Sequence, residues 1–189
     1  MDFTILLVVV VVAALFIILL YNKLVALRQT RKNAFSDIDV QLRQRFDLIP
    51  QLVETVKGYM KHEQEILENV TAARAGVDQA GDGLDSGRVK AESALSGAMM
   101  NLFAVAENYP DLKADANYRQ LMAELSDIEN KIAAARRFFN NATSEYNTAV
   151  QQFPANLIAG QFGFKTEEFF EVDEATNKAM QNAPDIKLT

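Results

Sequence analysis

The sequence predicts an all-α fold: an N-terminal single transmembrane helix continues into a long antiparallel helical bundle or coiled coil, with a short aromatic-rich C-terminal segment. Three observations predict it. An uncharged, mostly aliphatic run fills residues 3–22. Beyond this run, apolar residues recur at helical spacing without the alternation typical of strands. The chain of 189 residues has only 4 prolines and 8 glycines, which stand at a few points where turns are expected.

The amino-terminal run is long enough to cross a bilayer, because about twenty helical residues rise about 30 Å. A secretory signal peptide is the alternative. The run is preceded by Asp2 rather than by a positive charge, however, and no small-residue cleavage site follows it. We therefore expect residues 1–22 to be an uncleaved transmembrane anchor. The representative residues of the span are Phe3, Leu7, Val11, Leu15 and Leu20.

Four basic residues, Lys23, Arg28, Arg31 and Lys32, follow the run closely. Lys and Arg mark the cytoplasmic flank of a membrane span, so the amino terminus is expected outside and the remaining chain in the cytoplasm. Arg28 and Lys32 are four residues apart and share one face of a helix, from which they could contact anionic lipid headgroups. The alternative is that these residues act only as a topology signal.

Three long helices are expected after the anchor, over about residues 23–75, 88–108 and 117–152. The last is the clearest, because its apolar residues follow one another at spacings of 4 and 3 over more than four heptads. Such a seam packs lengthwise on partner helices. The seam residues are Leu121, Leu125, Ile128, Ile132, Ala135, Phe139, Ala142, Tyr146, Ala149 and Phe153.

Helix-breaking residues divide these stretches. Pro50 lies inside the first, and an interior proline removes a backbone donor, so we expect a kink or a new helix start after Asp47. Residues 76–87 contain four glycines and are expected to form a mobile loop. Because the connections are short, the helices should pack antiparallel in one bundle spanning residues 23–170.

Aromatic residues crowd the end of this bundle, and residues 171–189 are expected to form a partly ordered tail. Large aromatic side chains are usually buried, so they either cap the bundle or fill a groove on a neighbouring subunit. Phe138, which flanks the main seam, is a further candidate interface residue. The candidate interface residues are Phe138, Phe162, Phe164, Phe169 and Phe170.

No catalytic, cofactor-binding or metal-binding residues can be named from the sequence, and an enzyme is not expected. His62 is the only histidine, and Ile66 occupies the position where a helical zinc protease needs its second one. The chain has no cysteine and no phosphate-binding glycine loop. A net charge of −6 argues against nucleic acid, which needs a concentrated basic surface.

Four segments resemble the LemA family. They are residues 24–63 (LVALRQTRKNAFSDIDVQLRQRFDLIPQLVETVKGYMKHE), 107–115 (ENYPDLKAD), 128–147 (IENKIAAARRFFNNATSEYN) and 153–165 (FPANLIAGQFGFK). The order IDVQL, DLIP, VKGY is specific, and the segments together span most of the chain. Phe35 stands where the family often carries tryptophan, so an aromatic residue is retained.

The resemblance implies a bacterial protein with an amino-terminal membrane anchor and a long helical bundle, in a family without an established catalytic activity. With a cytoplasmic carboxyl-terminal domain, we expect the membrane to be the inner (cytoplasmic) membrane. One relative is associated with forming invaginated magnetosome membranes, and family genes often lie near genes for membrane proteases or other membrane proteins. The sequence therefore favours a homo-oligomeric, ring-like scaffold that organises or shapes membrane. An adaptor that binds another membrane protein, such as a protease, is the second hypothesis, and an enzyme built on bundle carboxylates is the third.

Overall fold

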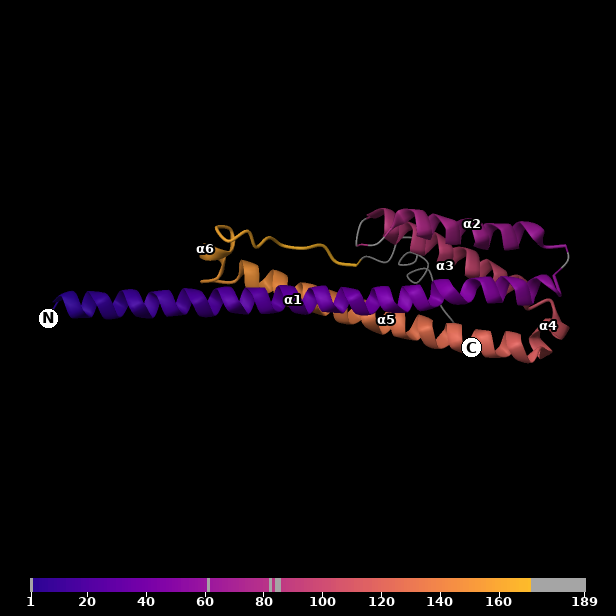
Figure 1. Cartoon of the computed structure of the whole chain (residues 1–189), viewed down its shortest axis with the longest axis horizontal. Helices are drawn as coiled ribbons and strands as arrows, with labels where there is room; N and C mark the ends of the chain where they lie inside the picture. Colours follow the sequence, from indigo (N-terminus) through magenta and orange to yellow (C-terminus); the bar gives the residue numbers. More distant parts are fainter. Residues whose placement is uncertain (1, 61, 82, 84–85, 171–189) are drawn as a thin grey trace, which may run out of the picture. The chain divides into compact units, whose positions relative to one another are not determined.

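The protein folds into helices without strands in the residues that its computed structural model describes, 2–60, 62–81, 83 and 86–170 (Figure 1). The predicted all-α class is confirmed. The predicted tail, residues 171–189, lies outside the described residues. In chain order the helices are α1 (Asp2–Lys57), α2 (Gln64–Ala80), α3 (Ser86–Ala106), α4 (Pro110–Ala114), α5 (Ala116–Gln151) and α6 (Asn156–Ala159).

The structure divides into two compact units, and α1 and α5 contribute to both. Unit 1 contains residues 2–41 and 131–170, which include α6. Unit 2 contains residues 42–130, which include α2, α3 and α4. Each unit has an apolar core of its own.

The single helix expected over residues 23–75 is two helices. α1 ends at Lys57, and α2 begins after a turn that starts at Gly58. Glycine is among the weakest helix formers, which favours an end at this position. The backbone N–H of Tyr59 then donates to the carbonyl oxygen of Val56 at 2.9 Å and closes the last turn.

The sequence predicts a kink or a new helix start after Asp47, and the second of these is wrong, because α1 runs from Asp2 to Lys57 with Pro50 inside it. The Pro50 ring is exposed. Pro50 has no N–H to donate to the carbonyl oxygen of Phe46, and Arg74 of α2 donates to this oxygen instead. The expected loop over 76–87 is also shorter, since α2 continues to Ala80. Gly81 caps the carboxyl end of α2, and its φ of 70° is a left-handed conformation that glycine adopts readily.

Unit 2 is a bundle in which the second part of α1, the helices α2 and α3, and the first part of α5 surround one core. α2 and α3 pack directly on each other. Figure 1 shows these helices running lengthwise beside one another, as the short connections predict. The buried core residues are Ile49, Leu52, Val56, Met60, Leu67, Val70, Val77, Leu95, Met99, Leu102, Ala106, Leu112, Tyr118 and Leu125.

Unit 1 packs the first part of α1 against the last part of α5, α6 and the segment up to residue 170. Its core contains Leu24, Tyr146, Val150, Ala155, Ala159 and Phe164, and Leu20 packs against them. The predicted seam of α5 is mostly buried or half-buried in both units. Phe153 is the exception. It lies beyond the end of α5 and is exposed, and Val150 is buried in this region instead.

Candidate functional site

The predicted membrane span is the exposed amino-terminal part of α1. This helix contains one segment that is long and apolar enough to cross a membrane, judged by length and composition, and none of that segment is buried in the structure. Phe3, Leu7, Val11 and Leu15 are exposed, whereas Leu20 is partly covered by the core of unit 1. Packed protein therefore begins within the last turn of the apolar run.

The four basic residues that follow the span differ in their surroundings. Lys23, Arg28 and Lys32 are exposed, as a contact with lipid headgroups requires. Arg31 is half-buried and is engaged within unit 1. It donates to Thr143 Oγ1 at 3.1 Å, and its guanidinium lies 4.8 Å from the centre of the Phe139 ring. Arg31 therefore joins α1 to α5 and is a poor candidate for lipid contact.

The candidate interface aromatics fall into two groups. Phe164 and Phe170 are buried, with 5% of each side chain exposed. Phe164 belongs to the core of unit 1, and the Phe170 ring packs edge-on against Phe139 at 6.5 Å between centroids. Both rings are therefore covered within unit 1. About half of each of Phe138, Phe162 and Phe169 is exposed, and these rings are open to a partner.

Two asparagines of α5 hold the extended segment that ends unit 1. Asn147 accepts the backbone N–H of Glu167 at 2.8 Å and donates to its carbonyl oxygen at 2.9 Å. Asn140 makes the same pair of bonds with Phe170, at 2.8 and 3.2 Å. The two asparagines are seven residues apart along a helix, and their partners are three residues apart along an extended segment. Both separations span about 10 Å, so each asparagine can meet its own partner. Arg31 adds a bond to the carbonyl oxygen of Glu168.

A charged network lies inside unit 2. Arg45, on α1, is fully buried and donates to Glu92 on α3 at 2.5 Å and to Glu129 on α5 at 2.7 Å. Arg88 Nε donates to the other Glu92 oxygen at 2.8 Å, and a second bond joins Arg88 to the carbonyl of Gly81. Glu92 thus bridges the two guanidinium groups of Arg45 and Arg88.

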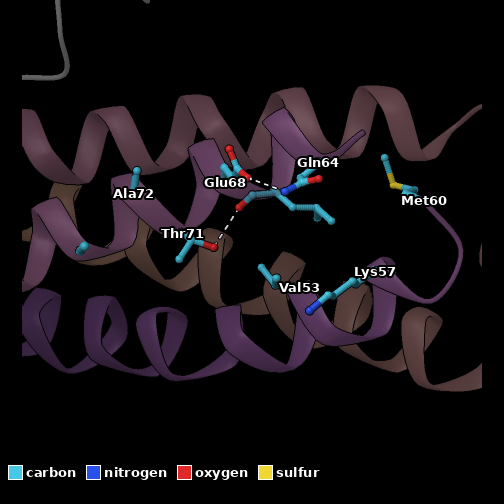
Figure 2. Close-up of a pocket in the computed structure, with 9 residues that line it drawn as sticks. Val53, Lys57, Met60, Gln64, Glu68, Thr71 and Ala72 are labelled. Atoms are coloured by element: carbon cyan, nitrogen blue, oxygen red, sulfur yellow. Dashed lines mark hydrogen bonds between the residues drawn. The ribbon is translucent and has the colours of Figure 1, made fainter. Parts of the chain in front are cut away.

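A groove of about 720 Å³ lies between α1 and α2 in unit 2 (Figure 2). Its walls carry Val53, Met60 and Leu67, and the charged groups Lys57 and Glu68 stand among them. Figure 2 shows Gln64 directed at Glu68, to which it donates at 2.8 Å. A groove of this size, mostly apolar with a few polar groups, fits a small apolar group or the side chains of a partner helix. The remaining lining residues are Thr71, Ala72 and Ala75.

Two tyrosine–carboxylate pairs join the turns of unit 2. Tyr59 donates its hydroxyl hydrogen to Asp115 at 3.0 Å, which raises the pKa of the tyrosine. The backbone N–H of Tyr118, at 2.9 Å, and then the Tyr59 hydroxyl lower the pKa of the Asp115 carboxyl. Tyr109 donates in the same way to Glu63, which raises the pKa of Tyr109. Among the described residues, no three His, Cys, Asp or Glu side chains are placed to hold a metal ion.

The sequence reasoning missed Arg45, Glu92 and the asparagine pair, and each left a signal. Arg45 takes the seam position between Leu42 and Ile49, at spacings of 3 and 4, where an apolar residue is expected. Glu92 likewise lies three residues before Leu95 on the buried face of α3. Opposite charges on the seams of two helices indicate a buried ion pair once those two helices are known to pack on each other. Asn140 and Asn147 are seven residues apart, a spacing that places both on one face of the helix.

Comparison with known proteins relates the chain to one family. The profile of the LemA family matches residues 34–187. The protein named magnetosome protein MamQ 2 from Paramagnetospirillum magneticum is 28% identical over 175 residues, covering 80% of this chain and 64% of its own length. MamQ from Magnetospirillum gryphiswaldense is also 28% identical, over 174 residues, with coverages of 79% and 64%. The protein named LemA from Metamycoplasma hominis is 26% identical over 153 residues, with coverages of 81% and 69%.

This chain thus spans 64% of the length of the MamQ relatives. Their similarity, together with the exposed apolar part of α1, suggests a membrane-anchored helical protein. The site that the geometry builds is accordingly a surface. It comprises the end of the span, the three exposed basic residues and the exposed aromatic rings of unit 1.

Proposed function

The chain belongs to the LemA family, and we propose that it is a membrane-anchored helical scaffold that self-associates through its helical units and organises or shapes the membrane. One observation carries the proposal. Leu20, in the last turn of the apolar run, already packs against the core of unit 1, so no linker separates the anchor from folded protein. If copies associate through their helical units, the geometry of this association therefore also fixes how their anchors are arranged in the lipid. The proposal includes no catalytic step.

Self-association is assigned to the exposed rings of unit 1. Phe138 and Phe169 are each about half exposed, and they flank the bonded pair Asn140 and Phe170 on neighbouring segments. An apolar span that has no glycine is a poor association surface in lipid, because small residues are what let helices approach closely there. The rings are therefore the better candidates. Identical copies would most simply close into a ring.

The mass of the full-length protein in detergent tests this proposal. Light scattering should give a mass of several chains, and Phe138→Glu combined with Phe169→Glu should shift it towards one chain. Arg137→Glu, an exposed change on the same helix as Phe138, is the control and should leave the mass unchanged. A single-chain mass at every concentration of the unchanged protein contradicts self-association.

The membrane and orientation belong to the proposal too. Exposed Lys23, Arg28 and Lys32 follow the span, and Lys/Arg bias places such a flank in the cytoplasm. We therefore assign the helical units to the cytoplasmic side of the inner membrane, with anionic headgroups as their lipid contacts. Protease added to intact spheroplasts should leave the units undigested and should digest them after lysis. Digestion of the units before lysis contradicts this orientation.

The groove between α1 and α2 favours a second function, an adaptor for another membrane protein such as a membrane protease. Thr71→Trp would fill the groove, since Thr71 lines it (Figure 2). Asn69→Trp, an exposed change on α2 outside the lining, is the matched control. If the groove binds the partner, copurification should fall for Thr71→Trp alone. Equal copurification by both variants contradicts a role of the groove.

A further inference from the structure

A second group of exposed apolar side chains lies outside the span. Residues 151–164 contain no Asp, Glu, Lys or Arg, although charged residues make up 23% of the chain. Three large side chains in this segment are exposed: Phe153 by 75%, Leu157 by 63% and Phe162 by 51%. An exposed apolar group without charged neighbours marks a surface that something apolar covers.

Contacts inside unit 1 place this segment beside the end of the apolar run. The ring of Phe162 meets the ring of Tyr21 edge-on, with 5.2 Å between centroids. Tyr21 is the penultimate residue of the uncharged run. On the other side, Ala155 and Ala159 lie in one core with Leu24. Figure 1 shows α6 near α1 in the same part of unit 1.

The length of the span sets the depth of these residues. Residues 3–19, at 1.5 Å per residue, cover about 26 Å, which is close to the thickness of a hydrocarbon core. Tyr21 then stands at the boundary between hydrocarbon and headgroups, where tyrosine is enriched in membrane proteins. A ring in contact with Tyr21 lies at the same depth. The segment is therefore held where lipid, rather than bulk water, surrounds α1.

We propose that residues 153–162 form an interfacial foot, which places the side chains of Phe153, Leu157 and Phe162 among the headgroups and upper acyl carbons of the lipid around α1. The surface is continuous with the anchor, and this continuity favours lipid over a second copy of the chain as the occupant. Phe and Leu are side chains that interfacial segments bury at the boundary between headgroups and acyl chains. The foot would fix the depth and the tilt of α1, whether or not the protein self-associates.

Tryptophan fluorescence of the full-length protein in phosphatidylcholine vesicles tests the foot, because the chain has no tryptophan of its own. Phe162→Trp and, separately, Leu157→Trp introduce single probes at exposed positions. Phe138→Trp is the matched control, since Phe138 is 50% exposed on α5 and lies outside the foot. Each variant is measured in plain vesicles and in vesicles whose lipids carry bromine on the upper acyl carbons. Circular dichroism verifies that the helices are retained.

The expected result is a blue-shifted emission that brominated lipid quenches for Phe162→Trp and Leu157→Trp, with no lipid quenching for Phe138→Trp. Two probes keep the test valid if one variant fails to fold. Emission that is unquenched and water-like at both positions overturns the foot. Blue-shifted emission that brominated lipid leaves unquenched also overturns it, because protein would then cover the segment. A single-chain mass in detergent would refute self-association and leave this result unaffected.

Discussion

Arg74 supplies Phe46 with the hydrogen bond that the helix itself cannot make. The carbonyl oxygen of Phe46 would normally accept the N–H four residues later, but that residue is Pro50, which has none. Arg74 Nε, on α2, donates to this oxygen at 3.2 Å. The same guanidinium lies 3.8 Å from the centre of the Phe46 ring, a cation–π contact. α1 therefore continues through its proline because α2 satisfies it from the side.

This relationship predicts a coupling between Arg74 and Pro50. Arg74→Leu should lower the free energy of unfolding by about 1–2 kcal/mol, because the Phe46 carbonyl loses its donor and the ring loses its cation. In a Pro50→Ala background the loss should be smaller, since the introduced alanine donates to that carbonyl. Urea unfolding of the four proteins forms the cycle, with the exposed Arg137→Leu as control. Equal losses in both backgrounds would refute the coupling.

Removing Glu92 should be among the most destabilising single changes in unit 2. Glu92 accepts from both Arg45 and Arg88, and its side chain is 2% exposed. Glu92→Leu leaves these guanidinium groups without their shared carboxylate, and breaking a buried pair costs about 3–5 kcal/mol. Chemical denaturation measures the loss. Glu65→Leu, an exposed change on α2, should stay within about 0.5 kcal/mol.

A double variant separates pairing from packing. Arg45→Met with Glu92→Leu removes both charges of this pair, so neither member is left facing the other unpaired, although Arg88 and Glu129 each lose one partner. The double variant should therefore be less destabilised than the sum of the two single variants. Additive losses would mean that Arg45 and Glu92 stabilise unit 2 independently.

The helical class and the long α5 could be predicted from the sequence because their signal is local. Spacings of 4 and 3 keep one face of a helix apolar whatever its partner, and residues such as Leu125, Ile132 and Phe139 are indeed buried. The start of α5 after Asp115 is equally local, since Asp is a preferred N-cap. These features need no knowledge of the rest of the chain.

The remaining features depend on residues that are distant in sequence. A proline inside a helix predicts a break unless a donor arrives from elsewhere, and Arg74 comes from the next helix. Gly58 is permissive rather than decisive, so pattern alone did not place the end of α1 there. Arg45 is a charge on a seam, which a sequence scan assigns to solvent unless Glu92 is known to face it.

Asn147 should control how tightly the extended segment of unit 1 is held. Asn147→Ala removes two hydrogen bonds to Glu167, so the free energy of local opening should fall by about 1–2 kcal/mol. The open form is then more populated, and the observed cleavage rate should rise roughly tenfold. Limited trypsin digestion reads this out directly at Lys165, which is exposed and lies two residues before Glu167.

The neighbouring asparagine provides the control for this measurement. Asn141→Ala changes an exposed residue of the same helix and should leave the cleavage rate at Lys165 unchanged. Asn140→Ala should also accelerate cleavage, because Asn140 holds Phe170 by the same pair of bonds. Cleavage at the same rate in Asn147→Ala and Asn141→Ala would show that the clamp does not limit opening.

Asp115 should make the stability of unit 2 depend on pH in the acid range. Bonds from the Tyr118 N–H and the Tyr59 hydroxyl lower its pKa from the ordinary value of 3.8, so the folded state favours the carboxylate. The stabilisation is therefore fully present above that value and is lost as the pH falls through the lowered folded pKa.

Asp115→Asn retains a capping side chain without the charge. Thermal unfolding should show the unchanged protein to be the more stable at neutral pH, with the difference vanishing in strong acid. Asp37→Asn, at an exposed position of α1, controls for the loss of one negative charge. A difference that persists unchanged at low pH would rule out the Asp115 carboxylate as its source.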